Sequence, residues 1–317
     1  MRIAIIGRTR MLLDSAKALL DAGHSIALVA TAEPSPEYGV GRKEYESLAE
    51  FCGAKFLFAP RINDPIFVDA LTQASVDVGV SLNWPIILQA ATCDTPHYGI
   101  LNAHAGDLPR YRGNACPNWA IINGETKIGL CVHRMEAGQV DAGPIYARDY
   151  FDIAEDTYIE DVYRWMASSI PSLFVSAVSH LSDLGFQPED QQSRGCRALR
   201  CHPRRPEDSR INWKSNAVDI HRLIRASSRP FSGAFSWLEG VDLVRIWRAC
   251  IPSLEHDLLG VPGQIMGRGP SGGVLVACGH GVIEIEESSL ENGQPLPSAN
   301  RFRLASWPAR NQGRHDD

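Results

Sequence analysis

Short apolar runs alternate with amphipathic segments along the first hundred residues of the chain. After the run at 3–6, apolar residues recur at three-and-four spacing from Leu12 to Leu20, which is typical of one helix face, and Gly23 marks its end. Strands that alternate with helices of this length predict parallel pairing through right-handed crossovers. The expected strands are residues 3–6, 26–30, 55–59, 76–82 and 99–104, and an expected helix follows each of the first three.

A long helix is predicted in the middle of the chain, after further strand-like runs. Thr157 followed by Glu160 matches a capping box, which is a signal for the start of a helix. Apolar residues then keep helical spacing from Ile159 to Leu181. Such a stripe is typical of core packing rather than of a cofactor site.

The second half of the chain differs in composition and in spacing. Residues 188–212 are polar and rich in Gln and Arg, which is typical of a linker. One short helical stretch then precedes five short strand-like runs, a pattern that predicts a small β-barrel or sandwich. We therefore expect an open, mostly parallel, Rossmann-like α/β sheet with helices on both faces, followed by a small β-barrel-like domain. The expected division is a catalytic domain over 1–187, a linker over 188–212, a β-rich domain over 213–303 and a flexible tail over 304–317.

Composition and charge exclude several classes of protein. Hydrophobic residues make up 44% and charged residues 21%, as in a globular protein with a sizeable core. The net charge of −6 argues against a protein whose affinity rests on neutralising a nucleic-acid backbone. No stretch approaches the roughly 20 apolar residues that cross a bilayer, and the N-terminal run is too short for a signal peptide. The eight cysteines show no zinc-site spacing, so we expect reduced thiols, no metal and a cytoplasmic location.

Two polar residues stand at the end of the fifth expected strand. Asn102 and His104 are two positions apart, so their side chains share one face of the strand. The carboxyl ends of parallel strands form the ligand-binding rim of such sheets, which also places Arg8–Arg10 and 83–87 at this rim. Two small residues follow His104 and leave room for a substrate. By themselves these features favour a structural histidine that satisfies a loop carbonyl over a catalytic one.

A carboxylate in a glycine-rich turn offers a partner for the histidine. Asp141 stands between Gly138 and Gly143, and turn formation alone would explain an aspartate there. A general base, however, needs an orienting group, and a His–Asp pair supplies one. The residues alone leave both interpretations of Asp141 open.

Three motifs in this order resemble the 10-formyltetrahydrofolate-dependent formyltransferase family, namely Asn102-Ala-His104, Leu108-Pro-x-Tyr-Arg-Gly113 and Asp141-x-Gly143. The resemblance covers most of the chain and implies a methionyl-tRNA formyltransferase-like fold. It implies a catalytic trio of Asn102, His104 and Asp141, with N10-formyltetrahydrofolate as co-substrate and no metal. It also implies a folate pocket formed by the loop after the fourth strand and the neighbourhood of Asp141, at Asn83, Trp84, Pro85, Ile86, Ile87, Gly138 and Val140.

The chemistry of formyl transfer fits these residue types. An amine attacks the formyl carbon, and a tetrahedral oxyanion develops that the Asn102 amide can stabilise by donating a hydrogen bond. His104 would take the proton of the attacking amine and later assist departure of the folate nitrogen. Asp141 would hold the imidazole in orientation and raise its basicity.

The acceptor amine is indicated by further stretches of resemblance. Residues 203–213 and 114–119 resemble the amino-sugar formyltransferases, whereas 226–235 resembles a segment shared with the tRNA branch. The resemblance therefore implies a nucleotide-linked amino sugar, used for a bacterial surface polysaccharide. The residues that we assign to binding this substrate are Arg8, Arg10, Tyr111, Arg112, Gly113, Asn114, Trp119, Arg204 and Arg205.

Two alternatives stay open at this point. The first is methionyl-tRNA formylation, and the second is a catalytically silent protein that binds folate or a nucleotide sugar. The N-terminal segment lacks G-x-G-x-x-G spacing and the chain has no G-x-x-x-x-G-K-[ST], which argues against a dinucleotide site and an NTPase site. A homodimer is possible because small β domains with exposed edge strands often pair.

Overall fold

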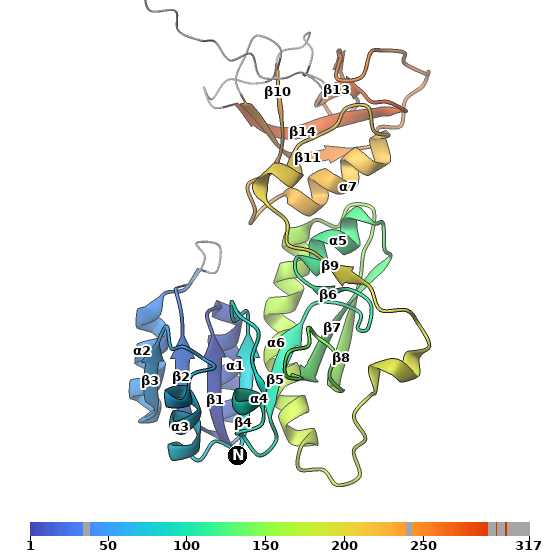
Figure 1. Cartoon of the computed structure of the whole chain (residues 1–317). Helices are drawn as coiled ribbons and strands as arrows, with labels where there is room; N and C mark the ends of the chain where they lie inside the picture. The colour runs from blue at the N-terminus through green and yellow to red at the C-terminus, as the bar shows by residue number, and fades with distance from the viewer. Residues whose placement is uncertain (34–38, 239–242, 291–295, 297–301, 303–317) are drawn as a thin grey trace, which may run out of the picture. The chain divides into compact units, whose positions relative to one another are not determined.

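The computed structural model describes residues 1–33, 39–238, 243–290, 296 and 302 (Figure 1). The chain divides into two compact units, of which the first contains residues 1–120, 125–154 and 161–203, and the second contains the remainder. The change from one unit to the other therefore falls at Pro203, inside the stretch that we expected to be a linker. The expected flexible tail at 304–317 lies outside the described residues.

The first unit is built on a seven-stranded sheet of mixed direction. The strand order is β3-β2-β1-β4-β5-β7-β8, and the first five strands in this order are parallel while β7 and β8 are antiparallel additions. All five residues of β4 are buried, as expected for a central strand covered on both faces. The strands are β1 (Arg2–Gly7), β2 (Ser25–Thr31), β3 (Lys55–Phe58), β4 (Val78–Leu82), β5 (Ile100–His104), β7 (Lys127–Arg134) and β8 (Ile145–Asp152).

Helices flank this sheet, and their ends carry the expected signals (Figure 1). The side chain of Thr9 caps the helix after β1, and the side chain of Asp64 caps a helix that has Pro65 at its first position. The helices are α1 (Arg10–Asp21), α2 (Arg42–Cys52), α3 (Pro65–Gln73), α4 (Ala90–Cys93), α5 (Cys116–Ile122) and α6 (Ile159–His180). The expected mixed α/β architecture with a mainly parallel sheet is confirmed.

Part of the expected linker is ordered against the first unit. The 3₁₀ turn η2 (Gln191–Arg194) is followed by β9 (Arg200–Cys201), which pairs in parallel with the two-residue strand β6 (Arg112–Gly113). Gly113 has a φ of 101°, and a side chain there would place Cβ 2.3 Å from the carbonyl oxygen of Cys201. Glycine is therefore required for this close approach.

The second unit holds an antiparallel sheet with one helix. The sheet has the order β10-β11-β14-β13-β12, and α7 (Ala217–Ser227) contacts β11. The strands are β10 (Ala234–Trp237), β11 (Leu243–Cys250), β12 (Ile265–Arg268), β13 (Val274–Ala277) and β14 (Val282–Leu290), preceded by the 3₁₀ turn η3 (Pro206–Ser209). Trp213 is fully buried in this unit, where its ring stacks on Phe302 and its Nε1 donates to Ser236 Oγ at 2.9 Å.

Candidate active site

The first unit contains a cavity of about 400 Å³ at the carboxyl ends of β1, β4 and β5. This is the position at which open α/β sheets bind ligands. The cavity is lined by residues of four segments that are far apart in the sequence, together with two residues of α6 and one of β9. The lining residues are Thr9–Met11, Ser81–Ile87, Asn102–Ala105, Gly113–Pro117, His133, Met135, Gln139–Asp141, Tyr163, Met166 and Arg200.

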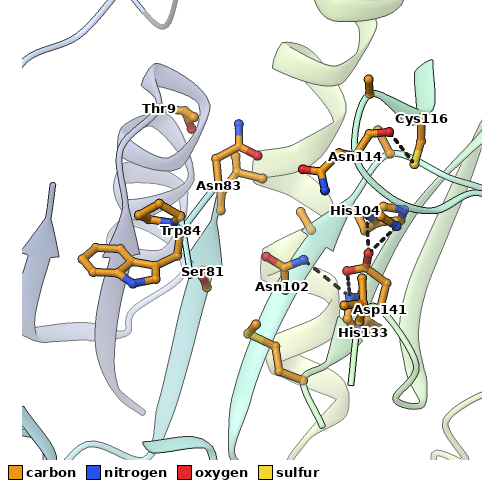
Figure 2. A pocket seen from close by; sticks show the side chains of 18 of the residues that line it. Thr9, Ser81, Asn83, Trp84, Asn102, His104, Asn114, Cys116, His133 and Asp141 are labelled. Atoms are coloured by element: carbon orange, nitrogen blue, oxygen red, sulfur yellow. Dashed lines mark hydrogen bonds and ion pairs between the residues drawn. The ribbon is translucent and has the colours of Figure 1, made fainter. Parts of the chain in front are cut away.

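Asn102 lies beside a histidine that the sequence analysis did not select. In the antiparallel register of β5 and β7, Asn102 is directly opposite His133. The amide Nδ2 of Asn102 is 3.4 Å from Nε2 of His133, whose Nδ1 donates to the carbonyl oxygen of Arg134 at 3.0 Å (Figure 2). His133 is almost fully buried, so its ring is fixed and holds the Asn102 amide in one orientation.

His104 is held between a carboxylate and a backbone carbonyl. Its Nδ1 lies 3.4 Å from Oδ2 of Asp141, and its Nε2 donates to the carbonyl oxygen of Tyr111 at 2.6 Å. The neighbouring Gly106 makes this arrangement possible, because a Cβ there would lie 2.6 Å from the His104 Nε2. Gly106, two positions after His104, thus leaves room for the imidazole ring itself. To accept a proton on Nε2, His104 has to leave the carbonyl of Tyr111 and adopt the neutral tautomer whose single proton is on Nδ1, facing Asp141.

Asp141 connects the two histidines. Its Oδ1 lies 3.4 Å from His133 Nε2 (Figure 2). Its Oδ2 accepts the backbone N–H of Gly113 at 2.8 Å. Burial would raise the pKa of Asp141, but the facing His104, His133 and the Gly113 N–H outweigh burial and hold its pKa below the usual value. Asp141 adopts a left-handed backbone conformation with a φ of 49°, which aspartate tolerates better than most residues.

A second set of hydrogen bonds fixes the turn that carries Asp141. The side-chain Nε2 of Gln191 donates to the backbone carbonyls of Asp141 and Gly143 at 2.9 and 2.8 Å. The Oε1 of the same Gln191 accepts from the guanidinium of Arg112. Arg112 therefore holds the turn through Gln191 and is not among the residues that line the cavity.

The wall formed by Ser81–Ile87 has a different character. Ile86 and Ile87 are 52% and 51% exposed, although large aliphatic side chains are usually buried. The buried atoms Ser81 Oγ and Trp84 Nε1 have no hydrogen-bond partner within the described residues. Apolar exposure and unpaired polar atoms on one wall indicate a surface suited to a partly apolar ligand.

Comparisons with known proteins identify the family. The formyl transferase family matches residues 1–178, and the formyl transferase C-terminal domain family matches residues 204–304. The chain belongs to the formyl transferase family. A methionyl-tRNA formyltransferase of Pelotomaculum thermopropionicum is 30% identical to this formyltransferase over 97% of both chains.

Solved structures show the same fold at lower identity. HypX of Aquifex aeolicus, solved with tetrahydrofolic acid, is 19% identical with a TM-score of 0.60, covering 94% of this chain and 46% of HypX. This formyltransferase thus spans about half the length of HypX. An N-formyltransferase of Helicobacter canadensis, solved with folinic acid and dTDP-3-aminofucose, is 17% identical with a TM-score of 0.59, covering 90% of this chain and 98% of the other.

The structure brings together most of the residues that the sequence analysis selected. Asn102, His104 and Asp141 all line the cavity of this formyltransferase, and their catalytic roles stay predictions. The selected folate-binding residues do so as well, except for Gly138, whose N–H donates to the carbonyl of Leu88. Among the residues selected for substrate binding, those that line the cavity are Arg10, Gly113 and Asn114.

The other selected substrate-binding residues have contacts elsewhere. Arg8 donates to the backbone carbonyls of Glu33 and Asn83, the hydroxyl of Tyr111 donates to Glu125, and Trp119 Nε1 donates to the carbonyl of His202. Arg204 belongs to the second unit, where its guanidinium donates to the Asp208 carbonyl and to Ser209 and Ser227. The backbone N–H of Arg205 donates to the carboxylate of Asp208 and so closes the turn η3.

Several residues at the site were missed by the sequence analysis, among them His133, Gln191 and Arg200. His133 is a polar residue inside an otherwise apolar strand, and this signal could have identified it. Gln191 and Arg200 lie in the stretch that was interpreted as a linker, and nothing in their local sequence indicates that η2 and β9 fold against the cavity.

Within the described residues, the structure holds no cluster of three or more His, Cys, Asp or Glu side chains arranged for a metal ion. None of the helices in the described part of the chain combines the length and apolar character needed to cross a bilayer.

Proposed function

We propose that this formyltransferase moves a formyl group from N10-formyltetrahydrofolate to an amine, with Asn102, His104 and Asp141 at the reacting centre. The observation that carries the proposal is the meeting of these three side chains in one cavity at the carboxyl ends of the strands. A silent binding protein would need neither the amide nor the buried His–Asp pair. The proposal includes the cytoplasmic location expected from the sequence.

The cavity suits a folate on its Ser81–Ile87 wall. The half-exposed Ile86 and Ile87 offer apolar surface to a flat ring, and the unpaired hydroxyl of Ser81 offers a hydrogen bond. Further support comes from the relatives, because HypX was solved with tetrahydrofolic acid and the Helicobacter protein with folinic acid. N10-formyltetrahydrofolate would supply the formyl carbon.

The residues opposite this wall would perform the transfer. The Asn102 amide, oriented by His133, would donate a hydrogen bond to the oxygen of the formyl group as negative charge develops there. His104, as the neutral tautomer with its proton on Nδ1 facing Asp141, would take the proton of the attacking amine on Nε2 after leaving the Tyr111 carbonyl. Asp141, kept ionised by its lowered pKa, would keep the imidazole in place and stabilise its positive charge.

For the acceptor, the proposal is a nucleotide-linked amino sugar. The Helicobacter relative supports it, since that protein was solved with dTDP-3-aminofucose, and so does the net charge of −6 on this chain. Arg200 adds positive charge to the cavity wall, and Arg10, which is paired with Asp14, lies there as well; an arginine at this position suits the phosphates of such a substrate. Methionyl-tRNA is the second candidate, because the Pelotomaculum relative carries that name and matches over nearly the whole chain.

A direct assay separates these acceptors. The purified protein is incubated with N10-formyltetrahydrofolate and either methionyl-tRNA or a panel of nucleoside diphosphate amino sugars, and tetrahydrofolate release is followed. In parallel, nucleoside diphosphates are screened by thermal unfolding, where a ligand at 100 times its dissociation constant adds about 2.7 kcal/mol of stability. We expect turnover with an amino sugar and stabilisation by its nucleotide. Turnover with methionyl-tRNA, with tRNA retarded in a gel at moderate salt, would replace the sugar by the tRNA.

A further inference from the structure

A buried hydroxyl on β4 has no partner within the described residues. Ser81 is 1% exposed, and its Oγ makes no hydrogen bond, although it lines the cavity. Other buried serines behave differently, since Ser15 Oγ donates to the carbonyl of Met11 at 2.7 Å and Ser236 Oγ accepts from Trp213. A buried hydroxyl without a partner destabilises a protein, so a hydroxyl kept at such a position points to a partner other than the described residues.

The sheet places this hydroxyl next to the reacting centre. In the parallel register of β4 and β5, Ser81 is paired with Asn102, and in the antiparallel register of β5 and β7, Asn102 is paired with His133. The three side chains therefore form a row across the sheet, with Asn102 in the middle. Figure 2 shows Ser81 on the side of Asn102 away from His104 and Asp141.

The position of Ser81 determines which ligand it faces. It lies on β4, which leads directly into residues 83–87 of the same wall, where Ile86 and Ile87 are half exposed. The groups that handle the proton of the amine, His104 and Asp141, lie on the other side of Asn102. A ligand group that contacts Ser81 is therefore part of the molecule that covers the 83–87 wall.

We propose that the Ser81 hydroxyl hydrogen-bonds the folate co-substrate, at a polar atom close to its formyl group, and so fixes that group beside the Asn102 amide. The inference rests on the proposed function, because it assigns the folate to this wall. Ser81 can donate and accept, so the hydroxyl suits either a carbonyl oxygen or an N–H of the ligand. Its role is to bind and position the formyl donor, while the acceptor amine contacts other residues.

The test uses folinic acid, a stable formylated folate, as the probe for binding. Ser81→Ala and Ser81→Cys both remove the hydroxyl while keeping a small side chain, and Ser15→Ala is the matched control in which a partnered buried hydroxyl is lost. Binding is measured by calorimetry on the full chain, thermal unfolding is measured without ligand, and the Michaelis constants of donor and acceptor are measured separately.

We expect both Ser81 variants to bind folinic acid about fivefold to tenfold more weakly, the value of one net hydrogen bond. The Michaelis constant of the formyl donor rises by a similar factor, and that of the acceptor changes less than twofold. The unfolding temperature of Ser81→Ala does not fall, because no internal hydrogen bond is lost, whereas Ser15→Ala leaves folinic acid binding unchanged. Unchanged binding in both Ser81 variants, or lower stability with equal changes in both Michaelis constants, overturns the assignment of Ser81. If the unaltered protein fails to bind folinic acid, the proposed function fails first and the inference falls with it.

Discussion

The two sides of the cavity differ in how many of their polar groups have partners within the described residues and in how far their apolar side chains are exposed. On the side that we propose for the reaction, each of Asn102, His104 and Asp141 has a partner within 3.4 Å among neighbouring side chains or backbone groups. On the opposite side, the hydroxyl of Ser81 has no partner in the part of the chain that the structure describes, and Ile87 is half exposed. Under the proposed function, the difference means that the groups assigned to the reaction are held in place by the protein alone, whereas the wall assigned to folate is completed by its ligand.

The difference has an energetic consequence. Groups that are already oriented need no reorganisation when charge develops, which is the main source of electrostatic catalysis. Unpaired and exposed groups instead lower the stability of the fold until a ligand covers them. Substitutions on the reacting side should therefore reduce turnover and leave folate binding intact, while substitutions on the binding wall should do the reverse.

The largest expected effect comes from His104→Asn. Asparagine cannot take the proton of the amine at neutral pH, so we expect the turnover number to fall by about 10²- to 10⁴-fold. Folinic acid should bind within about twofold of the unaltered protein, because His104 contacts Asp141 and Tyr111 rather than the 83–87 wall. Steady-state kinetics and calorimetry measure the two quantities.

His180→Asn is the matched control for that substitution. Its Nδ1 also donates to a backbone carbonyl, that of Tyr146 at 2.8 Å, and the residue does not line the cavity. We expect it to retain turnover within about twofold. If His104→Asn kept its turnover, His104 would not take part in the reaction, and the difference between the two sides of the cavity would not concern catalysis.

The sequence predicted the parts of this site that depend on local spacing. Asn102 and His104 share a face because strand side chains alternate, and the parallel order of β1, β4 and β5 brings the loops of 8–10 and 83–87 to the same rim. Asp141 combines both interpretations that the residues allowed. It lies in a left-handed turn position, as a turn residue would, and it also contacts the histidine.

The missed features depend on contacts between distant segments. His133 faces Asn102 only through the antiparallel register of β5 and β7, which no short motif encodes. Gln191 reaches the Asp141 turn from a segment whose polar composition is typical of a linker, because its amide satisfies two backbone carbonyls. Arg204 was selected for its charge, but its guanidinium donates to the Asp208 carbonyl and to the Ser209 hydroxyl within the second unit. Charge along a sequence does not say which acceptors the fold provides.

A substitution at Asp141 tests how much of the reacting side depends on its charge. Asp141→Asn keeps the shape and removes the charge that faces His104 and His133. We expect turnover to fall by about 10- to 100-fold, less than for His104→Asn, because the proton acceptor itself is retained. Asp107→Asn is the control, since Asp107 also forms ion pairs, with Arg148 and Arg194, but does not line the cavity.

The same variant gives a prediction for stability against pH. The pKa of Asp141 is lowered in the folded chain, so its carboxylate adds stability that is fully present above the unfolded value of about 4 and is lost as pH falls through the folded value. In urea unfolding, the stability difference between the unaltered protein and Asp141→Asn should therefore shrink as the pH falls from 5 to below 4. A difference that stays constant down to pH 3.5 contradicts the lowered pKa.

The smallest expected effect lies on the binding wall, at Ile87→Ser. The side chain is 51% exposed, so its loss costs the fold little, but an apolar contact with the ligand disappears. We expect folinic acid to bind about threefold to fivefold more weakly, with the turnover number at saturating donor unchanged. Ile66→Ser is the matched control, because Ile66 is 77% exposed on α3 and does not line the cavity. If Ile87→Ser and Ile66→Ser bound folinic acid equally well, the exposed side chain of Ile87 would not contact the ligand. Only Ser81 and its neighbours would then distinguish this wall from ordinary surface.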